Sequence, residues 1–281
     1  MNRRDVISLP HMTLINAARL RAGLVGPYAA VDVVSSTGST NADLRAAAVD
    51  GAPDRTVLIA EEQTAGVGRR GREWISPKDS ALCLSVLLRP QGVAFADLGS
   101  LAIVAGLAVL DLARELGVDA ALKWPNDVLA GPDRGKCAGI LAEAVAAEEV
   151  AVVLGIGLNV RPLGPGVRPG AGGLRPTSLA ENGARTTDRT EVAELLLTAF
   201  AAREGRWREA GGDLGHAGML DEYRKACDTL GQQVRVMLPG DAGLLGTATD
   251  VDPAGQLIVE DEQGKRHLVF AGDVVHLRAV P

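Results

Sequence analysis

Glycine and arginine dominate one short segment of the chain, Gly66-Val67-Gly68-Arg69-Arg70-Gly71-Arg72, and Trp74 comes two residues later. Glycine permits tight turns and close approach of the backbone to a ligand, so such a segment does not build a core. Guanidinium groups bind carboxylates and phosphates through paired hydrogen bonds. The segment therefore predicts a flexible loop that closes over an anion, and the alternative is a solvated basic turn.

Five further motifs flank this loop. Ser39-Thr40-Asn41 and Glu62-Gln63-Thr64-Ala65 precede it, and it is followed by Lys123-Trp124-Pro125-Asn126-Asp127, Gly135-Lys136-Cys137-Ala138-Gly139-Ile140-Leu141 and Gly155-Ile156-Gly157-Leu158-Asn159. In this order and spacing the set resembles the biotin–protein ligases (biotin–[acetyl-CoA-carboxylase] ligases). The resemblance covers residues 31–278, nearly the whole chain.

This resemblance implies a two-step reaction with ATP and biotin as substrates and Mg²⁺ as the metal. Biotin is activated to biotinoyl-5′-AMP, and a lysine of the biotin-carrier domain of an acyl-CoA or pyruvate carboxylase then attacks the mixed anhydride. A catalyst for these steps must bring two anions together, neutralise charge on the α-phosphate and exclude water. It needs no covalent nucleophile, and none is evident in the sequence.

Lys136 is the first candidate for the electrostatic role, because it is a cation in an otherwise apolar strand pattern. The alternative is an edge-strand lysine whose ammonium reaches solvent. The resemblance implies that Lys136 lies beside the biotin carboxyl and the α-phosphate. It also implies that Arg69 and Arg72 close the loop and hold phosphate, whereas Arg70 is solvated.

The segment with Lys123, Asn126 and Asp127 resembles the catalytic turn of the family. Trp124-Pro125 stiffens it, because proline restricts its own φ and the residue before it. Three roles stay open for Asp127: pairing with a loop arginine, orienting the incoming lysine, or binding Mg²⁺.

Ser39, Thr40, Asn41 and Gln63 resemble the polar groups that address the ureido ring of biotin, and helix N-capping by Ser39 or Thr40 is a compatible explanation. Asn159 is expected to face nucleotide or metal, with a β-turn asparagine as the alternative. Trp74 either stacks on adenine or belongs to the core. The predicted sets are catalytic, Lys136, Arg69, Asp127 and Lys123; biotin-binding, Ser39, Thr40, Asn41, Gln63, Gly66, Val67, Gly68, Arg69, Lys136 and Gly139; ATP-binding, Arg69, Arg72, Trp74, Asn126, Lys136 and Asn159; and metal-binding, Asp127.

The predicted fold is α+β, and 281 residues suit one large and one small domain. Apolar patterns indicate strands at 56–60, 80–89, 136–145 and 150–160 and helices at 97–116 and 190–207. Short strand patterns after Gly231 indicate a small β-barrel. The resemblance implies a class II synthetase-like mixed or antiparallel sheet with flanking helices and an SH3-like barrel. The predicted division is an N-terminal extension at 1–30, a catalytic domain at 31–229 and the barrel at 230–281.

Composition excludes several classes of protein. A net charge of −6 argues against a general nucleic-acid coat or a polybasic membrane binder. Three scattered cysteines indicate neither a disulfide framework nor a zinc site, and no apolar run reaches 18 residues, so a soluble cytoplasmic protein is expected. We expect a monomer or weak homodimer.

Three alternatives to a monofunctional biotin ligase remain. The weakest is a non-catalytic nucleotide-binding module, which a turnover measurement would distinguish. A lipoate–protein ligase or octanoyltransferase shares the ligase-like fold but lacks the glycine–arginine loop and the Lys123–Asp127 motif in this form. A biotin-responsive DNA-binding repressor carries an N-terminal winged helix, and the catalytic pattern here begins near Val31, which leaves no room for one. Specific DNA binding is therefore not expected.

Val67 stands where the family usually has arginine, which generates a prediction. An arginine adds a charge-assisted hydrogen bond to the closed loop, of about 1.5–3 kcal/mol, whereas valine offers only apolar cover. Val67→Arg should therefore slow release of biotinoyl-5′-AMP more than it changes biotin affinity. Single-turnover release rates and biotin titration of both proteins test this, and an unchanged release rate would show that the substitution is merely tolerated.

Overall fold

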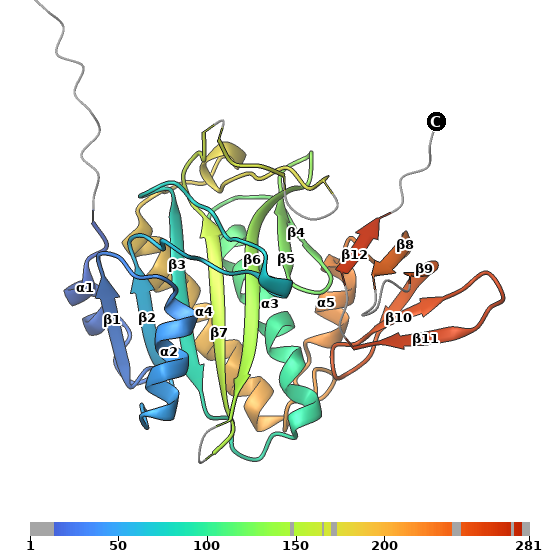
Figure 1. The fold of residues 1–281 in the computed structure, drawn as a ribbon, viewed down its shortest axis with the longest axis horizontal. Coiled ribbons are helices and arrows are strands. Elements are labelled where there is room, and N and C mark those ends of the chain that lie inside the picture. The colour runs from blue at the N-terminus through green and yellow to red at the C-terminus, as the bar shows by residue number, and fades with distance from the viewer. Residues whose placement is uncertain are drawn as a thin grey trace, which may run out of the picture.

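Two β-sheets organise the protein (Figure 1). The computed structural model describes residues 14–146, 149–164, 166–169, 173–237, 243–270 and 273–276. Residues 1–13 of the predicted N-terminal extension and residues 277–281 of the predicted barrel lie outside the described residues.

The larger sheet has seven strands in the order β1-β2-β3-β7-β6-β5-β4. Only β1 and β2 pair in parallel, and every other neighbour is antiparallel. The strands are β1 (Ala30–Val34), β2 (Thr56–Ala60), β3 (Ala81–Leu88), β4 (Ala120–Lys123), β5 (Asp127–Ala130), β6 (Gly135–Val145) and β7 (Ala151–Asn159). This mixed, mostly antiparallel sheet confirms the predicted fold class.

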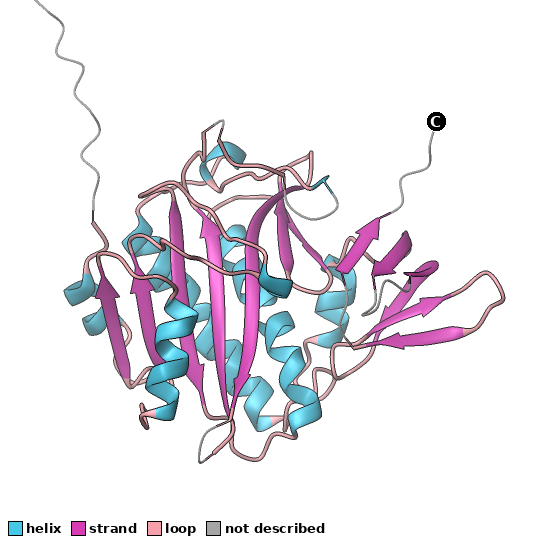
Figure 2. Ribbon diagram, in the orientation of Figure 1, coloured by secondary structure: helices cyan, strands magenta, loops and turns pink. Residues whose placement is uncertain are grey.

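Helices cover both faces of this sheet, with α2 on one face and α3 and α4 on the other (Figures 1 and 2). A strand buried on both faces reads as a continuous apolar run, and every residue of β3 is buried. The helices are α1 (Ala17–Gly23), α2 (Thr40–Val49), α3 (Leu101–Glu115), α4 (Arg189–Glu209) and α5 (Leu220–Ala226).

One helical segment in the described part of the chain, Phe95–Glu115, is long and apolar enough to cross a membrane by length and composition. Its mean hydropathy is 1.8. Two thirds of its most apolar window is buried within the fold (67%), against the sheet and α4. The segment is therefore a core helix.

The smaller sheet comprises β8 (Gln233–Met237), β9 (Gly243–Val251), β10 (Leu257–Glu260), β11 (Arg266–Val269) and β12 (Asp273–His276). Its order is β11-β10-β9-β8-β12, and all of its pairs are antiparallel. Val234 and Val236 are buried, Gln233 and Arg235 are exposed and Met237 is half-buried, the alternation of a sheet with one solvated face. The sheet is not closed between β11 and β12 across the described residues.

The Lys123–Asp127 segment forms a turn, as predicted, and this turn joins the paired strands β4 and β5. Each of these strands has four residues, too few to show a clear period in sequence. Lys123 and Asp127 are register partners in this hairpin. Their side chains are consequently held by strand pairing.

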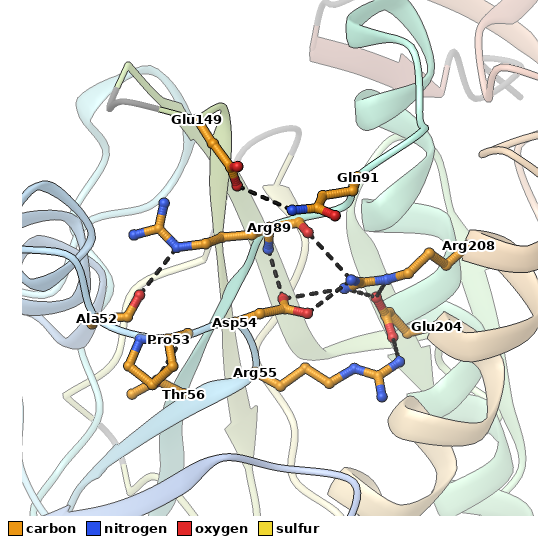
Figure 3. A network of polar contacts seen from close by, with 10 residues as sticks. All are labelled: Ala52, Pro53, Asp54, Arg55, Thr56, Arg89, Gln91, Glu149, Glu204 and Arg208. Atoms are coloured by element: carbon orange, nitrogen blue, oxygen red, sulfur yellow. Dashed lines mark hydrogen bonds and ion pairs between the residues drawn. The ribbon is translucent and has the colours of Figure 1, made fainter.

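A cluster of ion pairs ties α4 to the end of the sheet where β2 begins and β3 ends (Figure 3). The Glu204 carboxylate, whose side chain is 1% exposed, accepts from Arg55 and Arg208. Arg208 also contacts Asp54 at 2.8 Å, and Asp54 accepts from the backbone N–H of Arg89 at 2.7 Å. These contacts fix the C-terminal half of α4 against the sheet.

We predict that Glu204→Gln destabilises the fold without affecting ligand binding, because the cluster is remote from the site described below. Hydrogen bonds to charged groups contribute about 1.5–3 kcal/mol, and this loss is expected in the free energy of unfolding measured with urea. Glu194→Gln is the matched control, since its ion pair with Arg19 is partly exposed. That control should cost about 1 kcal/mol or less, and equal losses would contradict the prediction.

Candidate active site

A cavity lies on the α2 side of the large sheet, where the glycine–arginine loop crosses in front of β7 toward β6 (Figure 1). Residues from α2, the loop, the β4–β5 hairpin, β6 and β7 line it together. The predicted residues among them are Ser39, Thr40, Asn41, Gln63, Val67, Gly68, Arg69, Arg72, Trp74, Lys123, Asn126, Asp127, Lys136 and Gly139. Segments that are far apart in sequence thus converge as the motifs indicated.

Glycines form the floor of this cavity. A Cβ at Gly157 would lie 2.4 Å from the Trp74 indole, and one at Gly139 would lie 3.0 Å from it. A Cβ at Gly155 would lie 2.3 Å from Asn41 Oδ1. Gly139 and Gly157 are register partners on β6 and β7, so they open one continuous patch of bare backbone. Flat groups can lie directly on the sheet there.

A chain of polar contacts forms the α2 side of the cavity. The backbone N–H and the hydroxyl of Thr40 donate to Gln63 Oε1 at 2.8 and 3.0 Å. The hydroxyl of the buried Ser85 lies 2.7 Å from Thr40 Oγ1 and 2.6 Å from Asn41 Oδ1. Ser39 caps α2, as predicted, by accepting from Ala42 N at 3.4 Å. These contacts fix the orientations of Thr40, Asn41 and Gln63.

Asn41 also reaches across the sheet, because its Nδ2 donates to Glu143 Oε2 at 2.8 Å and lies 3.3 Å from Leu141 O. Both ends of its amide are therefore already bonded to protein. Asn41 lines the cavity, and its hydrogen bonds connect α2 to β6.

The ammonium of Lys136 lies 2.6 Å from Asp127 Oδ1. It also lies 5.7 Å from the centroid of the Trp74 ring, a distance at which a cation is attracted to an aromatic face. Both side chains of the ion pair are largely buried, at 22% and 12% exposed. Lys136 is therefore a fixed cation, and Asp127 has one carboxylate oxygen committed to it.

The glycine–arginine loop folds back on itself as a short hairpin. Trp74 N donates to Gly66 O at 2.8 Å, and Gly68 N donates to Arg72 O at 2.6 Å. Arg70 adopts a left-handed conformation with φ of 56° and is exposed. Arg69 instead turns toward the β4–β5 hairpin, with Nη1 3.4 Å from Asn126 Oδ1. The loop thus places one arginine inward and another outward.

The β4–β5 hairpin is held from the C-terminal side. Trp124 N donates to Thr229 Oγ1 at 3.0 Å, and Trp124 Nε1 donates to Gly255 O at 2.9 Å. Trp124 is 2% exposed, so these donors are satisfied in a buried setting. The buried Lys123 is consequently fixed beside the cavity.

Two predicted site residues do not line the cavity. Asn159 is buried at the end of β7, and its Nδ2 lies 2.9 Å from Thr177 O and 3.3 Å from Lys136 O. Gly66 packs beneath Trp74, where a Cβ would lie 2.6 Å from Trp74 O. Both shape the site through the backbone.

Several residues of the site were not predicted from the sequence, among them Glu73, which lines the cavity. Ser85 supports the polar chain, and its signal was a hydroxyl inside an apolar strand run. Gly155 and Gly157 line the cavity and lay in a recognised motif without being assigned to the site. Cys83, opposite Gly157, is a neutral neighbour, since burial raises the pKa of its thiol.

The lining charges are unbalanced. Four cationic residues face the cavity, Arg69, Arg72, Lys123 and Lys136, against the carboxylates of Glu73 and Asp127. Such a surplus favours binding of anions. The site is suited to bringing together two negatively charged substrates on an uncharged glycine floor.

Family models match both parts of the chain. Residues 31–159 match the Biotin/lipoate A/B protein ligase family, and residues 229–277 match the Biotin protein ligase C terminal domain. The biotin–[acetyl-CoA-carboxylase] ligase of Mycobacterium tuberculosis is 43% identical over 99% of this chain and 100% of that protein. The bifunctional ligase/repressor of Escherichia coli is 32% identical over 91% of this chain and 76% of that protein.

A solved structure of a biotin protein ligase also resembles this chain. The biotin protein ligase of Aquifex aeolicus, in complex with biotin and ATP, matches with a TM-score of 0.72 and 26% identity over 90% of this chain and 100% of that one. Fold and cavity together thus define a synthetase-like ligase. The chain belongs to the biotin/lipoate A/B protein ligase family and, within it, to the biotin protein ligases.

We predict that Gly157→Ala displaces the Trp74 indole, because the new methyl group would lie well inside contact distance. Overpacking of this kind costs about 1–3 kcal/mol of unfolding free energy. The near-ultraviolet circular dichroism of tryptophan should change at the same time. Gly205→Ala on α4 is the control, since nothing lies within 4 Å of its Cβ position and alanine favours a helix. Equal stability in the two variants would show that the floor tolerates a side chain.

Proposed function

We propose that this cavity binds biotin and ATP side by side, joins them as biotinoyl-5′-AMP and passes biotin to a lysine of a carboxylase biotin-carrier domain. The observation that carries the proposal is the fixed Lys136 ammonium beside the glycine floor, at the point where the loop meets the β4–β5 hairpin. The matching C-terminal domain disfavours the lipoate or octanoate alternative.

The biotin end of the cavity is assigned to the α2 side. Thr40 and Gln63 are oriented there by their mutual hydrogen bonds, and Ser39 lines the same wall. Oriented polar groups make a ring site specific, because an analogue that lacks their partner leaves them unsatisfied. Val67, Gly68 and Gly139 supply the less polar cover.

The nucleotide end is assigned to the loop and hairpin. Arg69 and Arg72 line the cavity from the loop, and Asn126 faces them from the hairpin. Arginine suits phosphate because its donors bind two oxygens at once. Trp74 lies between the two ends, and Asn159 supports the site by bonding the carbonyl of Lys136.

In the first step a biotin carboxylate oxygen attacks the α-phosphorus of ATP and pyrophosphate leaves. Lys136 provides positive charge where the two anions meet, and Asp127 holds its ammonium in place. In the second step the carrier lysine attacks the acyl carbon and AMP leaves. The closed loop keeps water from the intermediate between the steps.

Mg²⁺ is proposed to enter with ATP. The metal is commonly bound by one or two carboxylates together with substrate phosphates, and Asp127 is the cavity carboxylate placed to take part. Among the described residues, no group of three or more Asp, Glu, His or Cys side chains could hold a metal ion by itself. Bound Mg²⁺ would neutralise phosphate charge.

The proposal also includes a division into domains at 31–229 and 230–281. It further includes a carboxylase biotin-carrier domain as the acceptor. A carrier domain is a transient partner, and specific DNA binding and oligomeric state stay as predicted from the sequence. The proposed division is supported by the match of residues 229–277 to a separate C-terminal domain and by the start of the smaller sheet at Gln233.

Lys136→Ala tests the proposal. Removing one preorganised electrostatic donor typically lowers a rate about 10²–10³-fold, so biotin-dependent ATP–pyrophosphate exchange should fall by that factor. Lys225→Ala is the control, because that lysine is exposed on α5 and does not line the cavity. Exchange at the normal rate in Lys136→Ala would remove this residue from the mechanism.

A further inference from the structure

A buried arginine links the two ends of the segment 62–78, which contains the glycine–arginine loop. Arg189 is the first residue of α4, and its side chain is 0% exposed. Its Nη2 lies 2.5 Å from Glu61 Oε2 and 2.9 Å from Asp79 Oδ1. Glu61 directly follows β2 and Asp79 comes just before β3, so the two carboxylates mark the two ends of residues 62–78.

Strand pairing brings these two ends together. β2 and β3 are antiparallel neighbours with Ala60 opposite Cys83. The chain therefore leaves β2 and enters β3 at the same end of the sheet. Two carboxylates buried side by side repel each other unless a cation lies between them. Arg189 supplies that cation from the helix layer on the far face of the sheet, and no residue of the loop itself is needed.

Further contacts make both ends rigid. Glu61 Oε1 accepts from Ile15 N at 2.5 Å, and Glu61 N donates to Val34 O at 3.0 Å. On the other side, Ser80 O accepts from Val160 N and Arg161 N at 2.9 and 2.8 Å. Both ends of the segment 62–78 are thus anchored in the sheet.

The backbone at Asp79 is in the left-handed region, with φ of 64°. Non-glycine residues rarely adopt this conformation, and aspartate and asparagine tolerate it best. The ion pair with Arg189 holds Asp79 in it. Loss of the pair would allow the residue to relax and the start of β3 to move with it.

We propose that Arg189 is a positioning residue for the ligase reaction: by pairing with Glu61 and Asp79 it sets the closed geometry of the glycine–arginine loop over the adenylate. The inference rests on the proposed function for the role of the loop, but its structural part stands on contacts alone. Arg189 lines no part of the cavity, whereas Gln63 and Trp74, which lie between its two partners in the sequence, do line it.

Asp79→Asn is the appropriate variant. Asparagine keeps the shape of the side chain and tolerates the left-handed backbone, so the substitution removes one charge without new strain. Glu61→Gln is the equivalent change at the other end and serves if Asp79→Asn does not fold. Replacing Arg189 itself would leave two buried carboxylates uncompensated and endanger the fold.

α4 also provides a matched control. Its Arg203 is likewise buried between two carboxylates, Asp111 at 2.5 and 2.7 Å and Glu222 at 2.7 and 2.9 Å. This second cluster lies about 20 Å further along the helix, at 1.5 Å per residue, and touches no part of the loop. Asp111→Asn therefore removes the same kind of interaction from the same helix.

The experiment compares wild type, Asp79→Asn and Asp111→Asn in two assays. The first is the release rate of biotinoyl-5′-AMP formed from biotin, ATP and Mg²⁺. The second is the rate of tryptic cleavage after Arg69, Arg70 or Arg72 without ligand. In both assays Asp79→Asn should be at least about fivefold faster than Asp111→Asn, which corresponds to about 1 kcal/mol. The free energies of unfolding measured with urea should fall in both variants.

Equal release and cleavage rates in the two variants would overturn the positioning role and leave Arg189 as a purely structural residue. Failure of the proposed function gives a different result, because wild type itself would then form no biotinoyl-5′-AMP. The cleavage assay needs no ligand and decides the structural part in that case too.

Discussion

The bare backbone at Gly139, Gly155 and Gly157 is the constraint on which the rest of the site depends. Side chains at these positions would occupy the space that Trp74 and Asn41 take. The indole can therefore lie flat on the sheet, and the Lys136 ammonium can reach its face. The loop that carries Trp74 has to pass over this patch, which places its arginines next to the β4–β5 hairpin.

This arrangement brings more cationic than anionic side chains to the cavity. A cavity with more cations than carboxylates is stable only if its cations are held apart or paired, and Asp127 pairs with Lys136. Burial strengthens this pair relative to one in water. Incoming anions find oriented positive charge there, with little reorganisation needed during the reaction.

The helix layer on the other face of the sheet also supports the site. α4 is fixed at one end by Glu204 and Arg208 and at the other by Arg189, so it spans the sheet between two groups of ion pairs. The C-terminal domain adds a third support through Trp124 and Gly255. Parts of the chain that do not line the cavity thus hold the ends of the segment 62–78 and the β4–β5 hairpin.

Sequence by itself determined the fold class, the family and most residues of the cavity. These depend on local patterns, such as the apolar run of β3 and the glycine–arginine loop, which survive in any environment. It could not show that β4 and β5 pair across the Lys123–Asp127 segment, because four-residue strands carry too little periodicity.

Tertiary structure alone decided the directions of side chains. Asn159 bonds backbone carbonyls beside the cavity, and Ser85 reaches α2, because strand register selects the face on which each residue lies. Arg189 meets Glu61 and Asp79 across more than a hundred residues of chain. No local pattern encodes such a contact, since it arises only when a helix and two strand ends pack together.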